Sequence, residues 1–143
     1  MASVEIHPDF EHAFSAISDQ HPDFQNQLIA DFIRFIETDR MEYPAYFGRD
    51  SIYNWPHKAQ IEGVSHMHIA LPPRTFSGRR TLIDRTNPKD PDLDACLIYC
   101  EHAIDRGRIM FLDFFYPNAH QIARNERRMN YLARQAEKFH DDW

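Results

Sequence analysis

The sequence predicts an α+β fold, in which a small, mostly antiparallel sheet carries an N-terminal helix hairpin and a C-terminal helical segment. Two apolar runs, at 95–100 and 108–116, are joined by a short polar link that ends in Gly107, a pattern typical of a β-hairpin. Before and after this pair, apolar residues recur at intervals of three and four, as they do on one face of a helix.

The chain has 143 residues, enough for one domain with a substantial core. Its scarce glycines and abundant Phe, Ile and Leu favour an ordered globule. We expect a single domain made of a strand with a helix hairpin (1–39), an aromatic loop (40–63), the sheet (64–116) and the C-terminal helical segment (117–143).

The sequence has no feature of a membrane or secreted protein. No apolar stretch approaches the ~20 residues that span a membrane. The N-terminus lacks the basic start and apolar run of a signal peptide. We therefore expect a cytoplasmic protein without a membrane partner.

The N-terminal region is predicted to form a short strand at Val4–Ile6 and then two helices. His7-Pro8-Asp9-Phe10 recurs as His21-Pro22-Asp23-Phe24, and proline followed by an acid is typical of a helix start. The apolar faces of the two helices carry Phe10, Phe14 and Ile17, and Phe24, Leu28, Phe32, Phe35 and Ile36. Such faces need a sheet to cover them.

The segment from Arg40 to Glu62 has no periodicity, and its Pro44, Gly48 and Pro56 indicate an irregular loop. The loop is rich in Tyr, Phe and Trp. A long aromatic loop in a small domain either packs as a plug or binds a partner, and both interpretations are open.

Residues 64–71 are the next predicted strand. One of its faces carries Met67, Ile69 and Leu71, and the other carries His66, His68 and Ala70. We expect the apolar face to lie under the helix hairpin, which leaves both histidines on an open face. A basic turn at 74–80, a further strand at 81–86 and a loop at 87–92 then lead to the central hairpin.

After Pro117 the chain is predicted to be helical, with a break near Arg124. Its apolar stripe consists of Ile122, Met129, Leu132, Ala136 and Phe139. The predicted element order is β-α-α-β-β-β-β-α.

The two cysteines are predicted to be buried, reduced thiols. Cys96 and Cys100 are four residues apart on one predicted strand. At ~3.3 Å per residue they lie about 13 Å apart, too far for a disulfide.

The net charge of −6 disfavours nucleic acid as a partner, but the charge is uneven. Residues 1–50 hold ten acidic and three basic side chains, and residues 51–143 hold twelve and thirteen. This asymmetry indicates a partner surface in the second half of the chain.

From residue 44 to residue 139, the chain resembles the YafO-type toxins of the RelE/ParE superfamily. The resemblance rests on an ordered set of short matches: Phe47-Gly48-Arg49-Asp50, His66-x-His68-x-Ala70, Arg85-Thr86-Asn87, Tyr99-Cys100, Pro117, His120, Ala123-Arg124, Met129, Ala136 and Phe139. It implies a RelE-like fold with a curved sheet. It also implies an mRNA interferase toxin that cuts transcripts on the translating ribosome and is neutralised by a cognate antitoxin. The resemblance implies cleavage without a metal or other cofactor, by attack of the RNA 2′-hydroxyl on the adjacent phosphate.

This chemistry needs a proton acceptor, a proton donor and cations that stabilise the phosphorane. Histidine suits the first two roles and arginine the third. Together with the resemblance, this predicts the catalytic residues His66, His68, Arg85, His120 and Arg124. The alternatives are exposed histidines on a half-buried strand, a solvated helix surface for His120 and Arg124, and a carboxylate partner for Arg85. The two strand histidines lack a third metal ligand at a recognisable spacing, so no metal site is predicted.

The predicted RNA-binding residues are Arg49, Arg74, Arg79, Arg80, Arg127 and Arg128. Arg49 has an alternative role in pinning its loop through a salt bridge, and the basic turn could serve solubility alone. Arg127 and Arg128 suit rRNA or an acidic antitoxin segment equally. Asp113 interrupts an apolar strand, and it must be paired or protonated if it is buried.

A rival prediction from another functional class is a binding module. The same fold could inhibit a protein target, as gyrase-poisoning ParE-like toxins do, or persist as an inactive relic that binds an antitoxin. The set of histidines and arginines is the sequence feature that discriminates between the nuclease and this alternative.

Overall fold

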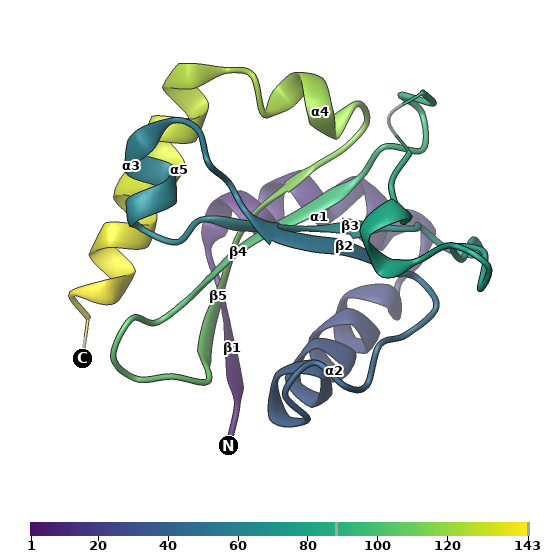
Figure 1. Cartoon of the computed structure of the whole chain (residues 1–143), viewed down its shortest axis with the longest axis horizontal. Helices are drawn as coiled ribbons and strands as arrows, with labels where there is room; N and C mark the ends of the chain where they lie inside the picture. Colours follow the sequence, from purple (N-terminus) through teal and green to yellow (C-terminus); the bar gives the residue numbers. More distant parts are fainter. Residues whose placement is uncertain (88, 143) are drawn as a thin grey trace.

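The computed structural model describes residues 1–87 and 89–142 and contains one five-stranded sheet with helices on both faces (Figure 1). The strands are β1 (Ser3–Ile6), β2 (Phe47–Ile52), β3 (Ser65–Ile69), β4 (Cys96–Glu101) and β5 (Arg108–Phe115). The helices are α1 (Pro8–Gln20), α2 (Phe24–Glu37), α3 (His57–Ile61), α4 (Ala119–Ile122) and α5 (Glu126–His140), with a 3₁₀ turn, η1, at Leu82–Asp84. The strand order is β1-β5-β4-β3-β2, and only β1 and β5 pair in parallel. The predicted α+β class and mostly antiparallel sheet are confirmed.

The predicted central hairpin is confirmed, with β4 as the middle strand of the sheet. Alternate β4 residues enter two separate cores: Leu97 and Tyr99 face one, and Ile98 and Cys100 face the other. Because both faces are covered, the strand is a continuous apolar run rather than an alternating pattern.

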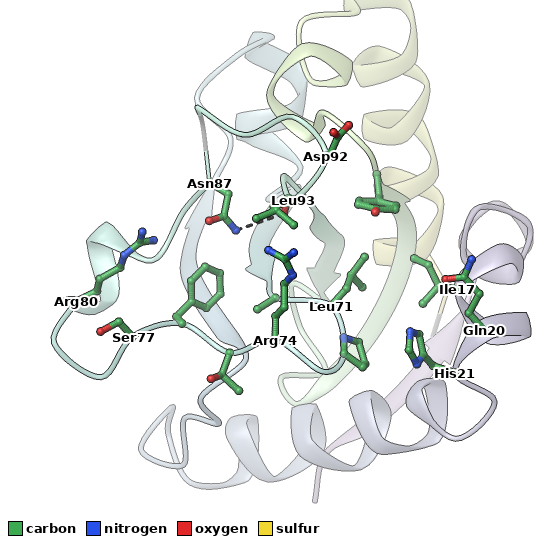
Figure 2. Close-up of a pocket in the computed structure, with 15 residues that line it drawn as sticks. Ile17, Gln20, His21, Leu71, Arg74, Ser77, Arg80, Asn87, Asp92 and Leu93 are labelled. Atoms are coloured by element: carbon green, nitrogen blue, oxygen red, sulfur yellow. Dashed lines mark hydrogen bonds between the residues drawn. The ribbon is translucent and has the colours of Figure 1, made fainter.

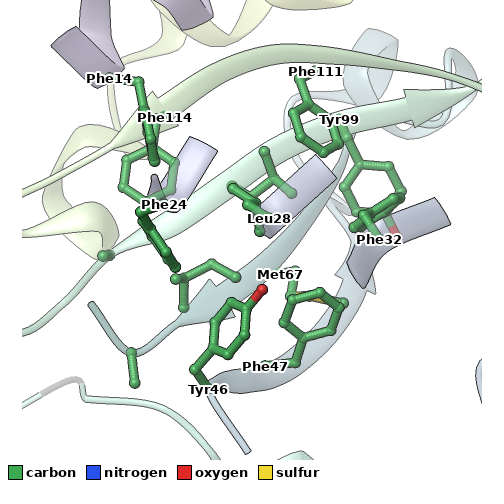
Figure 3. Close-up of a cluster of buried hydrophobic side chains, with 14 of the residues drawn as sticks. Phe14, Phe24, Leu28, Phe32, Tyr46, Phe47, Met67, Tyr99, Phe111 and Phe114 are labelled. Carbon is green, nitrogen blue, oxygen red and sulfur yellow. The ribbon is translucent and has the colours of Figure 1, made fainter. Parts of the chain in front are cut away.

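Helices α1 and α2 cover the first face with a core of aromatic rings (Figure 3). Phe32 packs edge-on against Tyr99 at 4.8 Å between ring centres, and Phe14 packs against Phe114 at 4.9 Å. Met67 also lies in this core. The helix hairpin therefore covers the apolar side of β3, as predicted.

Helices α3 and α5 cover the second face, so the prediction that this face is open is wrong. The stripe on α5 is buried against the sheet through Met129, Leu132, Ala133, Ala136 and Phe139. This stripe and the apolar face of β4 and β5 bury each other, as two such surfaces must. On this face, His68 is 4 % exposed and His66 is half-buried.

Two segments differ from the predicted secondary structure. The aromatic loop contains β2 and α3. The charged Arg49 and Asp50, together with a register shift between Phe47 and Asp50, conceal the strand pattern of β2. The strand predicted at 81–86 is wrong, because its apolar Leu82 and Ile83 are exposed on the 3₁₀ turn.

The prolines of the two repeated helix-start motifs take different positions relative to their helices. Pro8 is the first residue of α1, as predicted. Pro22 lies before α2, which begins at Phe24 after its N-cap Asp23. Only three residues connect the two helices, and His21 is used as the C-cap of α1.

The C-terminal segment breaks where it was predicted to. Helix α4 ends at Ile122, and Asn125 caps α5 by accepting a hydrogen bond from the backbone N–H of Arg128 (3.1 Å). Both cysteines are free and buried, as predicted. Among the helices of the described residues, none has the length and apolar character that crossing a membrane requires.

Gly48 lies where the chain passes between β3 and the loop after η1. A Cβ atom at this position would lie 2.8 Å from both His68 Cβ and Phe76 Cε2, and closer still to the carbonyl oxygen of Arg85. We expect Gly48→Ala to lower the free energy of unfolding by about 1–3 kcal/mol, because backbone and core would have to shift. Urea unfolding followed by circular dichroism measures this loss.

Gly78→Ala is the matched control. A Cβ at Gly78 would meet nothing within 4 Å, so its effect should stay within about 0.5 kcal/mol. Equal losses in the two variants would show that the space around Gly48 is not restricted.

Candidate functional site

The pairing of β3 with β4 brings three polar side chains together on the second face of the sheet. His68 lies directly opposite Cys96, and opposed residues present their side chains to one face. Asp94 precedes Cys96 by two residues, so the alternation of an extended chain turns it to the same face. The Nδ1 atom of His68 lies 3.4 Å from Cys96 Sγ and 3.9 Å from Asp94 Oδ1. All three side chains are buried.

His120 approaches this group from α4. The backbone N–H groups of Asn118 and Ala119 donate to the carbonyl oxygens of Pro91 and Asp94 (2.7 and 3.1 Å), which fixes the start of α4 over the loop before β4. The backbone N–H and the ring Nδ1 of His120 then both contact Asp94 Oδ2, at 2.8 and 2.6 Å. Because an ionised carboxylate only accepts hydrogen bonds, Nδ1 carries the proton and Nε2 is left for proton transfer.

Exposure differs sharply across this pair. The His120 side chain is 47 % exposed, whereas that of Asp94 is 1 % exposed. A buried carboxylate thus holds an imidazole that is open to solvent, the arrangement by which a carboxylate orients a histidine for general acid–base chemistry.

His66 extends the cluster into a row of three imidazoles. Its ring stacks on Tyr53 at 4.0 Å between ring centres, and its Nε2 lies 3.4 Å from Ser51 Oγ. The His66 and His68 rings are 5.6 Å apart, and the His68 and His120 rings are 5.4 Å apart. The three predicted histidines therefore lie together, although two of them are much less exposed than expected.

Burial makes the inner part of the cluster neutral. Burial, together with the smaller effect of the positive charges of Arg49 and of the neighbouring histidines, lowers the pKa of His66 to about 4 and that of His68 to about 3. Burial also raises the pKa of the Cys96 thiol, with a further contribution from the charge of Asp94. Near neutral pH, His66 and His68 are therefore uncharged imidazoles that can donate or accept hydrogen bonds.

The cations around the cluster are not the ones predicted as catalytic. Arg49 is exposed on β2, and its charge acts on both His66 and His68. Arg85 points elsewhere: its guanidinium donates to the Phe47 carbonyl oxygen (3.2 Å) and lies over the Tyr43 ring. The Arg85 carbonyl oxygen accepts from the backbone N–H of Arg49 (3.1 Å), so Arg85 supports the strand that carries Arg49.

Arg124, predicted to be catalytic together with His120, does not lie on the same helix, because α4 ends at Ile122. Arg124 is exposed in the turn between the last two helices, where it lines a shallow hollow with Asn125 and Arg128. The sequence interval of four residues therefore does not place its guanidinium beside the imidazole.

Two more predicted arginines lie on α5. Arg128 pairs with the buried Asp113, whose Oδ2 accepts from Nε and Nη2 at 3.2 and 2.9 Å. Burial raises the pKa of Asp113, and Arg128 opposes this shift. The carboxylate that interrupts β5 is therefore paired, which leaves Arg127 as the freely exposed member of the two.

The basic turn lines a hollow of its own (Figure 2). Arg74, Arg79 and Arg80 are exposed, and Arg74 and Arg80 line a hollow of about 590 Å³ between the turn and the loop that contains Asn87. None of the three histidines of the cluster is among the described residues that line it. The turn is thus a separate cationic surface.

The sequence alone did not indicate Asp94, Cys96 and Tyr53 as members of the site. Asp94 is 26 residues from His120 and also 26 from His68. Only the register between β3 and β4 and the docking of α4 bring these residues together. The spacing Asp94-x-Cys96 at the start of a predicted strand was the available signal, because it places both side chains on one face.

Comparisons with known proteins agree with the resemblance found in the sequence. A family model described as toxin YafO, type II toxin–antitoxin system, matches residues 33–141. The mRNA interferase toxin YafO of Escherichia coli (strain K12) is 31% identical over 116 residues, which cover 78% of this chain and 82% of that protein. No solved structure matches the chain, so the RelE-like assignment of the fold stays a prediction. The matched range contains the whole histidine cluster.

The low pKa of His68 predicts how stability depends on pH. An unfolded histidine has a pKa of ~6.5, whereas folded His68 stays neutral down to a pKa of about 3. Between these values the unfolded chain binds more protons, so stability falls as the pH falls. Between pH 7.5 and pH 5.5, the contribution of His68 should lower the free energy of unfolding by about 1.4 kcal/mol.

Urea unfolding at both pH values, with EDTA present, tests this in the wild type and in His68→Gln. We expect the variant to lose about 1.4 kcal/mol less than the wild type on acidification. His12→Gln, which changes an exposed histidine on α1, is the control. Equal pH dependence in the wild type and in His68→Gln would show that His68 is not held neutral in the fold.

Proposed function

This chain belongs to the YafO toxin family of type II toxin–antitoxin systems, and from that membership we propose that it is an endoribonuclease that cleaves mRNA on the translating ribosome. A cognate antitoxin neutralises it. The name of its Escherichia coli relative, mRNA interferase toxin, supports the reaction class. Cleavage in this proposal depends on the ribosome and does not depend on a metal.

The pair formed by Asp94 and His120 is the observation that carries this proposal. A 2.6 Å contact orients a half-exposed imidazole through a buried carboxylate. Such a pair can take a proton from one oxygen and deliver it to another without a change in the fold.

In the proposed reaction, the ribose 2′-oxygen attacks the adjacent phosphorus and the 5′-oxygen of the next nucleotide leaves. His120 Nε2 exchanges protons with these oxygens while Asp94 stabilises the imidazolium. His66, neutral and stacked on Tyr53, donates a hydrogen bond to the phosphate. Arg49, whose charge acts on the cluster, stabilises the phosphorane.

The remaining candidates take supporting roles in the proposal. His68 is a positioning residue behind His120, because it is 4 % exposed. Arg85 positions Arg49 through the backbone contact between them. Arg124, exposed beyond the end of α4, contacts an RNA phosphate. Side chains thus supply the proton transfer and the positive charge, so the proposed reaction needs no metal.

The separate basic surfaces suit the ribosome-bound substrate. The turn with Arg74, Arg79 and Arg80 and the exposed Arg127 on α5 are proposed to contact RNA phosphates. Arg128, which pairs with Asp113, can supply only part of its guanidinium. Because such contacts depend on local potential, they are compatible with the net charge of −6.

The variants His120→Ala and Asp94→Asn test the proposed pair. Each should reduce mRNA cleavage by about 10²- to 10⁴-fold, the usual contribution of a general acid–base group. Cleavage is measured by mapping new transcript 5′ ends a few minutes after induction in bacterial cells. Circular dichroism of the purified variants checks that they remain folded, and His12→Ala on α1 is the control for an exposed histidine.

The same mapping tests ribosome dependence and the rival function. New ends in translated regions should disappear when translation initiation is blocked. Growth arrest without new ends would instead favour a protein target, and full cleavage by folded His120→Ala would remove the pair from the mechanism.

A further inference from the structure

We propose that His68, Asp94 and Cys96 form a binding site for a thiophilic divalent transition metal, best matched by Zn²⁺, and that metal binding inhibits the nuclease. The inhibitory part rests on the proposed function, whereas the binding part does not. This assignment differs from the prediction that the chain has no metal site.

The three potential ligand atoms already converge. One ligand atom each from His68, Asp94 and Cys96 lies within 4.8 Å of the other two. In a tetrahedral zinc site with bonds of about 2.0–2.3 Å, neighbouring ligand atoms are about 3.3–3.6 Å apart. The 3.4 Å separation of nitrogen and sulfur falls in this range, and the 3.9 Å separation of nitrogen and oxygen exceeds it by a few tenths of an ångström.

One atom of the cluster needs a partner. Asp94 Oδ1 is buried and, among the described residues, has no hydrogen-bond donor. The other carboxylate oxygen is held by His120. Leaving a buried carboxylate oxygen unpaired costs free energy, and a cation bound between Asp94, His68 and Cys96 would remove that cost.

The backbone holds the ligands in place without the metal. His68 and Cys96 are directly opposed on neighbouring antiparallel strands. Asp94 is fixed at the end of the same ladder by its carbonyl contact with the N–H of Ala119 (3.1 Å). Little ordering therefore remains for metal binding to impose.

The ligand set selects the kind of metal. One thiolate, one imidazole and one carboxylate suit Zn²⁺ and related ions, whereas Mg²⁺ and Ca²⁺ prefer oxygen ligands alone. Loss of the Cys96 proton on binding leaves two negative ligands that balance the charge of the ion. His120 is the candidate for the fourth ligand of the metal, because its ring centre lies 5.4 Å from that of His68.

Metal binding would disable the proposed proton transfer. The ion would share the carboxylate of Asp94 that orients His120, and its double positive charge would oppose the imidazolium form of His120. A metal at this site therefore acts as an inhibitor in the proposed mechanism, not as its cofactor.

Cobalt titration of the purified full chain, without added RNA and with a phosphine reductant, tests the site directly. We expect a near-ultraviolet thiolate-to-Co²⁺ band that saturates at one equivalent and disappears when Zn²⁺ is added. Cys96→Ser should abolish the band. Cys100→Ser, which changes a second buried free thiol on the same strand, should retain it.

Asp94→Asn provides a second variant of nearly unchanged volume, and circular dichroism checks the fold of each. The Asp94→Asn substitution should weaken cobalt binding by at least roughly 10- to 100-fold, which is the loss of metal affinity seen when an outer-shell partner is removed. No band in the wild type, or a band that survives in Cys96→Ser and is lost in Cys100→Ser, would overturn the site.

The inhibitory part is tested by the ratio of mRNA cleavage with and without one equivalent of Zn²⁺, measured within each protein. Zn²⁺ should reduce cleavage at least about 10-fold in the wild type and in Cys100→Ser. In Cys96→Ser, cleavage with Zn²⁺ should equal cleavage without it. Cobalt binding with unchanged cleavage would overturn inhibition alone. If the metal-free protein does not cleave at all, the proposed function fails while the cobalt band still decides the site.

Discussion

The antiparallel pairing of β3 with β4 is the constraint on which both the core and the candidate site depend. In this register Met67 and Leu97 face the helix hairpin, while His68 and Cys96 face the C-terminal helices. A slip of one residue would exchange the faces of every side chain on β3. It would place histidines in the aromatic core and separate His68 from Asp94. The same hydrophobic burial that fixes the fold thus also fixes the polar cluster.

A second contact joins this sheet to the last part of the chain. Asp94 lies two residues before β4 and binds both the backbone and the ring of His120, so one buried carboxylate places α4 and orients its imidazole. The stripe of α5 packs on the same face of the sheet, where His68 is buried beside Cys96 and Asp94. A neutral, enclosed interior with one half-exposed imidazole follows from this packing. The site is therefore inseparable from the second core.

The sequence was informative where burial is continuous and where periodicity is strong. It predicted β4, β5, the helix hairpin and the break before α5, because apolar runs and capping residues are local signals. The apolar pattern around Leu82 predicted a strand that is not formed, and Leu82 is exposed. Chemistry and family resemblance found the three histidines. The partner that joins two of them, Asp94, could not be found, because its contacts depend on strand register and on residues 26 positions away.

The chemical ends of the cleaved RNA test the proposed mechanism most directly. Purified protein would be added to ribosomes translating a defined mRNA, and the fragments would be analysed by mass spectrometry. Attack by the ribose 2′-oxygen, with His120 transferring the protons and Asp94 stabilising its imidazolium, predicts 2′,3′-cyclic phosphate and 5′-hydroxyl ends. Fragments with 5′-phosphate and 3′-hydroxyl ends would contradict it, because those ends require attack by water at the phosphorus.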